Sequence, residues 1–191
     1  MRTFSILAAT AIAVLIGAST TANAGNPPVN AHAFSFTSID EKTSIDLKQY
    51  RGKVVLVVNT ASFCGFTPQY TGLQNIWQDY RNKGVVVLGV PSNDFGAQEP
   101  KSEAEIKDFC QGAFNVTFPL TAKVRVRGAQ AHAFYRWIDR STGGKASPRW
   151  NFHKILIAAD GRLAEWFASS VRPSSLKQAI EREIEKAKPE S

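Results

Sequence analysis

The sequence predicts an α/β fold in which helices cover a mixed β-sheet. Two continuous apolar runs, residues 54–58 and 85–90, are typical of strands that are buried on both faces. Apolar residues at helical spacing over residues 69–83 lie between them, so strand, helix and strand form a parallel βαβ unit. A third strand, residues 155–157, is followed by Asp160-Gly161, a hairpin signal that returns the chain antiparallel.

The segment before the βαβ unit is predicted to form an N-terminal β-hairpin. Apolar and polar residues alternate roughly over residues 34–39, and residues 44–47 follow after a polar turn. Arg51-Gly52 forms the turn into the first long strand, and Gly84 is the expected stop of the helix that follows that strand. The hairpin therefore precedes the strands of the main sheet along the chain.

The second half of the chain adds further helices and strands. Ser102 to Glu105 forms a capping box that begins a helix, and Gly112 is expected to end it. The remaining predicted elements are a short strand within residues 116–124, a helix at 131–139, the return strand at 163–167, and a final amphipathic helix over 173–184.

Composition indicates a single ordinary globular domain. The chain has 191 residues, of which 43% are hydrophobic and 20% are charged. The formal net charge is +7, but the basic residues are scattered and form no run. This pattern favours a solvated basic surface over binding to nucleic acid.

Residues 1–24 have the three parts of a secretory signal peptide. Arg2 supplies the positive charge, residues 4–16 are apolar, and Ala22-Asn23-Ala24 is an A-x-A cleavage site. The apolar stretch is too short to span a bilayer. We therefore expect export across the inner membrane to the periplasm, no stable membrane insertion, and one mature domain, residues 25–191.

Cys64 lies between the end of the first long strand and a predicted helix start. Thr67 is a favourable N-cap, and Pro68 suits the first helical position. The amides and the dipole at a helix N-terminus stabilise an anion, so this placement favours the reactive thiolate. Cysteine is also often a buried, inert residue, and residue type alone does not distinguish the two.

Cys110 is the other of only two cysteines. In an oxidising compartment the pair is compatible with a structural disulfide, a catalytic pair or two free thiols. Neither cysteine lies in a C-x-x-C motif, and His32, His132 and His153 have no metal-ligand spacing to each other or to the cysteines. We therefore expect no bound metal and no cofactor.

Four stretches, in order along the chain, carry a resemblance to a known family. They are Asn59 to Tyr70, Gly89 to Pro100, Phe109-Cys110 with Asn115 to Pro119, and Trp150-Asn151-Phe152. In these stretches the chain resembles the glutathione peroxidase family, in its cysteine rather than its selenocysteine form. The resemblance covers residues 34–186, and it implies a thioredoxin-like fold.

The resemblance implies reduction of hydrogen peroxide or organic hydroperoxides to water or an alcohol. Cys64 matches the peroxidatic position, where a thiolate attacks a peroxide oxygen and becomes a sulfenic acid. Trp150 and Asn151 match two members of the family's catalytic group, whose N–H groups would donate near the sulfur. Cys110 matches the resolving cysteine of members that use thioredoxin-type reductants, which implies a Cys64–Cys110 disulfide.

The resemblance also implies partners and a conformational change. The expected reductant is an external thiol or dithiol, either a thioredoxin-like protein or a small thiol. The short segment between Phe134 and Trp150 is similar to that of monomeric members. Because Cys110 shares a helical face with Ile106 and Phe109, we expect the helix to open locally before a disulfide forms.

One position departs from the family pattern. The family's catalytic glutamine is replaced by Asp94, and a carboxylate close to a thiolate disfavours it. Either Asp94 points away, or it is protonated, or the enzyme is slower. Gln98 is close in sequence and is a possible substitute, although the motif assigns it elsewhere.

Two other functional classes share these residues. A thiol–disulfide oxidoreductase has this fold, but it normally needs a second cysteine where this chain has Thr67. A redox sensor or relay that passes a disulfide to a partner needs the same two cysteines. Stoichiometric oxidation of a partner, with little turnover, would distinguish a relay from an enzyme.

Overall fold

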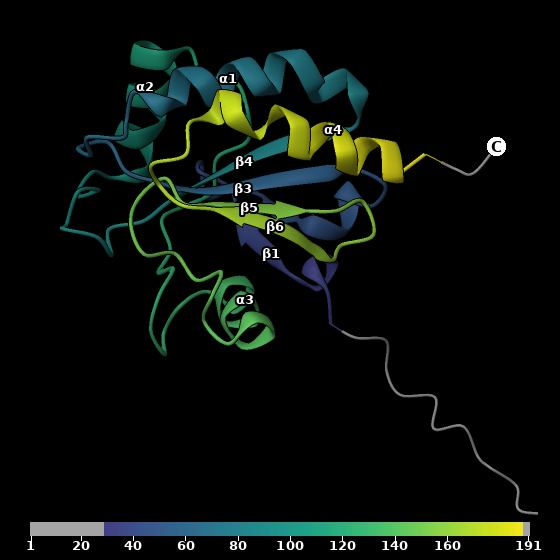
Figure 1. The fold of residues 1–191 in the computed structure, drawn as a ribbon. Coiled ribbons are helices and arrows are strands. Elements are labelled where there is room, and N and C mark those ends of the chain that lie inside the picture. The colour runs from purple at the N-terminus through teal and green to yellow at the C-terminus, as the bar shows by residue number, and fades with distance from the viewer. Residues whose placement is uncertain (1–28, 189–191) are drawn as a thin grey trace, which may run out of the picture.

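The computed structural model describes residues 29–188, in which a four-stranded mixed sheet lies between helices (Figure 1). Its strand order is β4-β3-β5-β6. The strands are β3 (Val54–Thr60), β4 (Val85–Pro91), β5 (Lys154–Ile157) and β6 (Leu163–Phe167). β3 runs parallel to β4 and antiparallel to β5, and β5 runs antiparallel to β6. The predicted mixed sheet is therefore confirmed.

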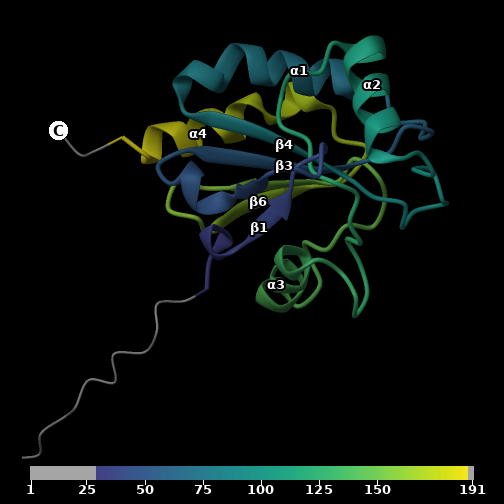
Figure 2. The same ribbon diagram turned by 180° about the vertical axis from the view of Figure 1, so that it is seen from behind.

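The helices lie on both faces of the sheet. They are α1 (Gln69–Tyr80), α2 (Glu103–Phe114), α3 (Ala133–Thr142) and α4 (Lys177–Lys186), with 3₁₀ helices at Ala31–Ala33, Leu47–Tyr50, Arg81–Lys83 and Pro173–Leu176. α1 and α4 cover one face, and α3 covers the other (Figures 1 and 2). β1 (Ser35–Thr37) and β2 (Ser44–Asp46) form the predicted antiparallel hairpin.

Alternate residues of β3 enter two separate hydrophobic cores. Leu56 and Val58 pack in the core that includes residues of α1, α2 and α4. Val55 and Val57 pack in the core that includes α3 and the β1–β2 hairpin. This explains the continuous apolar run, since every residue of β3 is buried.

Three local predictions are wrong. Thr67 does not cap α1, because its hydroxyl is used inside the preceding turn. Gly112 does not end α2, which continues to Phe114 and is terminated by Asn115 in the left-handed conformation (φ 52°). Residues 116–124 do not form a strand: the segment makes only two isolated bridges, from Leu120 to Gly89 and from Thr121 to Ser38.

The bridge at Gly89 requires a residue without a side chain. A Cβ atom built on Gly89 would lie 2.5 Å from a methyl carbon of Leu120. Gly89 instead exchanges backbone hydrogen bonds with Pro119 (3.0 Å) and Thr121 (2.9 Å). The chain after α2 is thereby fixed to the edge of β4.

The predictions on export concern residues 1–24, which lie outside the described part of the chain. Within residues 29–188, no helix combines the length and the hydrophobicity needed to cross a bilayer.

Candidate active site

Cys64 lies on the turn that connects β3 to α1. The residue is 7% exposed, and its Sγ accepts a hydrogen bond from the backbone N–H of Phe66 at 3.4 Å. Thr67 closes the turn, because its Oγ1 donates to the Ala61 carbonyl (2.9 Å) and accepts from the Cys64 N–H (3.1 Å). The sulfur therefore has a backbone donor on the turn before α1, and α1 itself begins without a side-chain cap.

β3 also holds the segment that contains Trp150. The Asn59 side chain donates to the Trp150 carbonyl (3.0 Å), and the Phe152 N–H donates to the Asn59 carbonyl (2.6 Å). The Trp150 ring packs against Phe95, with ring centroids 5.8 Å apart, and remains 40% exposed. β3 thus carries Cys64 on its following turn and fixes the Trp150 segment beside its C-terminal end.

Asn151 is fully buried, and its amide is held by the loop after β4. Its Nδ2 donates to Gln98 Oε1 (2.9 Å) and to the Phe95 carbonyl (3.4 Å). Its Oδ1 has no hydrogen-bond partner among residues 29–188. The same loop contacts the cysteine turn, because the Phe63 N–H donates to the Gln98 carbonyl at 3.0 Å. Gln98 therefore links Asn151 to the turn that contains Cys64.

Asp94 is directed to a different segment. Its Oδ2 accepts hydrogen bonds from the backbone N–H groups of Val126 (2.7 Å) and Arg127 (3.2 Å). The carboxylate thereby holds residues 126–127, which follow the segment that is bridged to Gly89. Of the three alternatives that the sequence left open for Asp94, this geometry matches a side chain that points away from the sulfur.

Cys110 is buried in α2, and both cysteines are free thiols. They belong to the same hydrophobic core. Burial raises the pKa of the Cys110 thiol to about 11, and the adjacent Tyr70 hydroxyl offsets only part of this effect. The buried thiol of Cys110 is therefore un-ionised at neutral pH.

The sequence did not predict the buried carboxyl group that lies next to the cysteine turn. Glu99 is fully buried, and its Oε2 accepts a hydrogen bond from Ser62 Oγ at 3.1 Å. Burial raises the pKa of Glu99 against the opposing effect of Ser62. No periodic pattern surrounds Glu99 in the sequence, so its burial follows only from the folded loop.

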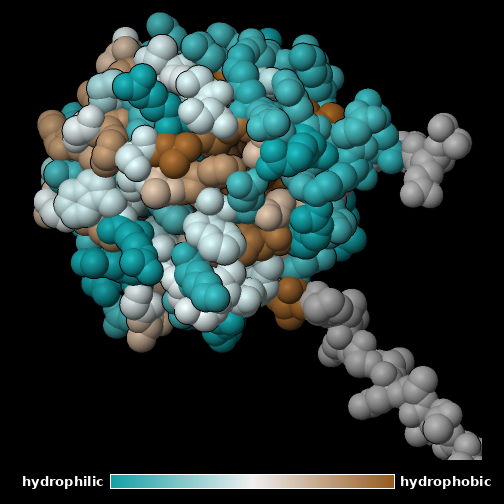
Figure 3. All heavy atoms as spheres, viewed as in Figure 1, coloured by the Kyte–Doolittle hydropathy of each residue, from teal (hydrophilic) through white to brown (hydrophobic). Residues whose placement is uncertain are grey.

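Two cavities flank the cysteine turn and share the side chains of Phe66 and Ser170. The first, which we call the Trp150 groove, has a volume of about 440 Å³. Its lining includes Phe66, Trp150, Trp166 and Ala168, together with the basic residues Lys145 and Arg149. The second, of about 580 Å³, extends along the start of α1. Apolar residues gather in the middle of the face shown in Figure 3, where β6 and the chain before α4 lie.

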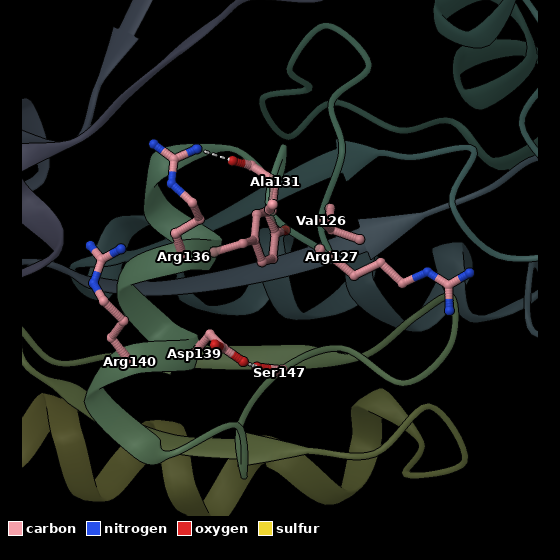
Figure 4. A pocket seen from close by; sticks show the side chains of 10 residues that line it. Val126, Arg127, Ala131, Arg136, Asp139, Arg140 and Ser147 are labelled. Atoms are coloured by element: carbon pink, nitrogen blue, oxygen red, sulfur yellow. Dashed lines mark hydrogen bonds between the residues drawn. The ribbon is translucent and has the colours of Figure 1, made fainter.

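A third cavity, of about 390 Å³, lies beside α3 (Figure 4). Arg127, Arg136 and Arg140 line it, but their guanidinium groups point away from one another. Asp139 and Ser147 are hydrogen-bonded to each other at 2.7 Å. This cavity therefore has no convergent set of donors for an anion.

The described residues contain no group of three or more His, Cys, Asp or Glu side chains that could hold a metal ion. The site consists of a thiol, its backbone donor, an indole and a pair of amides. These groups suit thiol redox chemistry.

Comparison with known proteins identifies the family. The glutathione peroxidase family model matches residues 31–139. The chain is 39% identical over 170 residues to "Hydroperoxy fatty acid reductase gpx1" of Synechocystis sp., covering 85% of this chain and 98% of that protein. It is 43% identical over 141 residues to "Glutathione peroxidase-like peroxiredoxin 2" of Saccharomyces cerevisiae, covering 72% and 87%.

Solved structures agree with this result. The crystal structure of T. cruzi GPX1 has a TM-score of 0.68 at 25% identity and covers 84% of this chain and 100% of that chain. A thioredoxin-family thiol:disulfide interchange protein from Chlorobium tepidum TLS has a TM-score of 0.61 at 13% identity, covering 84% and 99%, which supports the fold alone. The fold is thus thioredoxin-like, and with a family match over more than half of its length this chain belongs to the glutathione peroxidase family.

Proposed function

We propose that Cys64 is the residue at which this thiol-dependent peroxidase reduces its peroxide substrate. The observation that supports this proposal is the position of Cys64 Sγ, which accepts a hydrogen bond from the Phe66 N–H. The turn that holds it lies between the Trp150 groove and the loop after β4 that contains Gln98. The thiolate attacks one peroxide oxygen, the O–O bond breaks, and water or an alcohol leaves after protonation. The product is a Cys64 sulfenic acid.

Trp150 and Asn151 have different roles in this proposal. Both N–H groups of Asn151 are engaged, by Gln98 and by the Phe95 carbonyl, so Asn151 positions the loop rather than the substrate. The indole of Trp150 lines the groove and is the side-chain donor available to the departing oxygen. Asp94 serves as an anchor for residues 126–127.

Cys110 resolves the sulfenic acid in the second step. Its thiol attacks Cys64 sulfur, a disulfide forms, and the sulfenic oxygen leaves as water with the thiol proton. Because Cys110 is buried in the core below α2, part of that helix must open first. An external thiol or dithiol then reduces the disulfide, and four relatives bear the name peroxiredoxin.

The Trp150 groove favours organic hydroperoxides with an acyl chain as substrates. Phe66, Trp150 and Trp166 provide apolar walls beside the cysteine turn, and Lys145 and Arg149 suit a carboxylate at the end of the chain. A relative that is 39% identical is named hydroperoxy fatty acid reductase. The named relatives are reductases, peroxidases and peroxiredoxins, which favours an enzyme over a relay.

The cellular setting is part of the same proposal. The signal-peptide pattern of residues 1–24 supports a periplasmic mature protein that begins at Gly25, and the short segment between Phe134 and Trp150 supports a monomer. Mass spectrometry of exported protein would detect the loss of residues 1–24.

Consumption of peroxide with a panel of thiol donors tests the proposed function. The wild type should reduce both hydrogen peroxide and a fatty acid hydroperoxide, whereas Cys64→Ser should lose all turnover. Full activity in Cys64→Ser, or no activity in the wild type with any donor, would overturn it.

A further inference from the structure

Lys154, the first residue of β5, has a side chain that is completely buried. Its Nζ donates three hydrogen bonds, to Gln69 Oε1 (2.6 Å), the Val171 carbonyl (2.6 Å) and the Ser169 carbonyl (3.1 Å). An ammonium group has three N–H donors, so all of them are used. This geometry describes a buried ammonium with a complete set of acceptors.

None of these three acceptors carries a charge. Burial of an ammonium without a carboxylate partner is unfavourable, and it lowers the pKa of Lys154 to about 8. A methionine or leucine at this position would fill a core at lower cost. Core packing alone therefore does not explain a lysine at this position, and the hydrogen bonds of its ammonium indicate what it contributes to the structure.

The three acceptors join three parts of the active site. Gln69 is the first residue of α1, directly after the cysteine turn. Lys154 itself follows the segment that contains Trp150 and Asn151. Ser169 and Val171 lie on the chain between β6 and the last helices, of which residues 168–170 line the Trp150 groove.

We propose that Lys154 is a positioning residue, whose ammonium holds residues 168–171 against the start of α1 and so maintains the wall of the Trp150 groove. The inference rests on the proposed function in one respect, the use of this groove by an acyl chain. A second contact supports the same junction, because Gln69 Nε2 donates to the Ser169 carbonyl at 2.8 Å.

The charge of Lys154 makes this wall sensitive to pH. A neutral amine has two N–H donors for three acceptors, so loss of the proton releases one carbonyl or Gln69. The neighbouring His153 does not change charge in this range, because burial lowers its pKa to about 4. The charged side chains on the adjacent chain segments are those of Arg149 and Arg172. Loss of the proton therefore removes one hydrogen bond of the junction, while burial itself favours the neutral amine over the ammonium.

Lys154→Met tests the inference, because methionine fills the space without donating. The matched control is Lys177→Met, which removes an exposed lysine of α4 that pairs with Asp79 at 3.0 Å. We expect the ratio of kcat/KM for a long-chain fatty acid hydroperoxide to that for hydrogen peroxide to fall at least fivefold in Lys154→Met, through KM. The ratio should stay within twofold of wild type in Lys177→Met. An unchanged ratio in Lys154→Met would overturn the inference.

Amide hydrogen exchange tests the same junction without using activity. Residues 168–173 should exchange at least tenfold faster in Lys154→Met than in wild type, while β3 and β4 exchange at wild-type rates. If Lys154→Met does not fold, Gln69→Leu removes one acceptor of the junction and should accelerate the same residues. Wild-type exchange at residues 168–173 would contradict the positioning role even if the protein proved inactive toward every peroxide.

Discussion

Asn151 Nδ2 donates a partly buried hydrogen bond to Gln98 Oε1 at 2.9 Å, next to the cysteine turn. Asp94, four residues before Gln98, is directed to the backbone of Val126 and Arg127 instead. Gln98, and not the residue at position 94, therefore supplies the amide that is hydrogen-bonded to Asn151. This arrangement yields separate expectations for Gln98 and Asp94.

Gln98→Leu removes the acceptor of Asn151 and should slow formation of the Cys64 sulfenic acid about tenfold, a loss of about 1.4 kcal/mol of transition-state stabilisation. Gln98→Glu keeps an acceptor at the same place and should recover most of the rate. Stopped-flow measurement of the first turnover gives this rate directly. Equal rates in wild type and Gln98→Leu would show that the amide pair has no part in the peroxide step.

Asp94→Gln removes the carboxylate that holds residues 126–127, so the free energy of unfolding should fall by about 1–3 kcal/mol. The rate of sulfenic acid formation should change by less than about threefold, since the hydrogen bonds of this carboxylate are to the backbone of residues 126–127. Urea unfolding and stopped-flow kinetics measure the two effects. A tenfold faster peroxide step would mean that the carboxylate acts on the thiolate after all.

Cys110→Ser should leave the Cys64 sulfenic acid unresolved, so excess peroxide should oxidise Cys64 irreversibly to the sulfinic acid. Wild type treated with one equivalent of peroxide should yield a Cys64–Cys110 crosslink in peptide mapping. A wild type that stops at the sulfenic acid would instead indicate a cycle with one cysteine and a small thiol.

The pH dependence of the disulfide step distinguishes two orders of events. The pKa of Cys110 is about 11 while α2 is closed, because the thiol is buried. If α2 opens first, the rate should level off near the ordinary cysteine pKa of about 8.5. A rate that keeps rising to pH 11 would show that Cys110 ionises before α2 opens.

The buried ammonium of Lys154 also leads to a prediction about the free energy of unfolding. Its pKa is lowered from 10.5 to about 8 in the folded protein by burial, so between these values the unfolded chain binds more protons. The contribution of Lys154 to the free energy of unfolding should therefore rise with pH across this window, by at most about 3 kcal/mol. Lys154→Met should lose this rise. Denaturant titrations at pH 7.5 and 10 compare the two proteins, with Lys177→Met as the control that retains it.

The long strands could be predicted because each is a continuous apolar run. Val54 to Val58 reads as buried on both faces without knowledge of its neighbours, and the structure places it between two cores. Helix ends were less certain, since Gly112 and Asn115 both suit a helix stop and only packing decides between them.

The polar interior of the site could not be predicted in the same way. Gln98, Glu99 and Lys154 are ordinary surface residue types, and only contacts between distant segments bury them or join them to partners. Thr67 has the residue type of an N-cap, but the turn before α1 uses its hydroxyl. Sequence patterns describe a residue's own element, and these roles depend on other elements.

The capped ends of α2 set how far its cysteine can travel. Ser102 and Glu105 fix one end by a complete capping box, and Asn115 fixes the other by its backbone bonds to Cys110 and Gln111. A helix of 12 residues is about 18 Å long, whereas the same residues fully extended span about 40 Å. Once unwound, the segment can extend to roughly twice the length of the helix, while it stays fixed at the Ser102 end. Its slack lets Cys110 leave the core without any movement of the sheet.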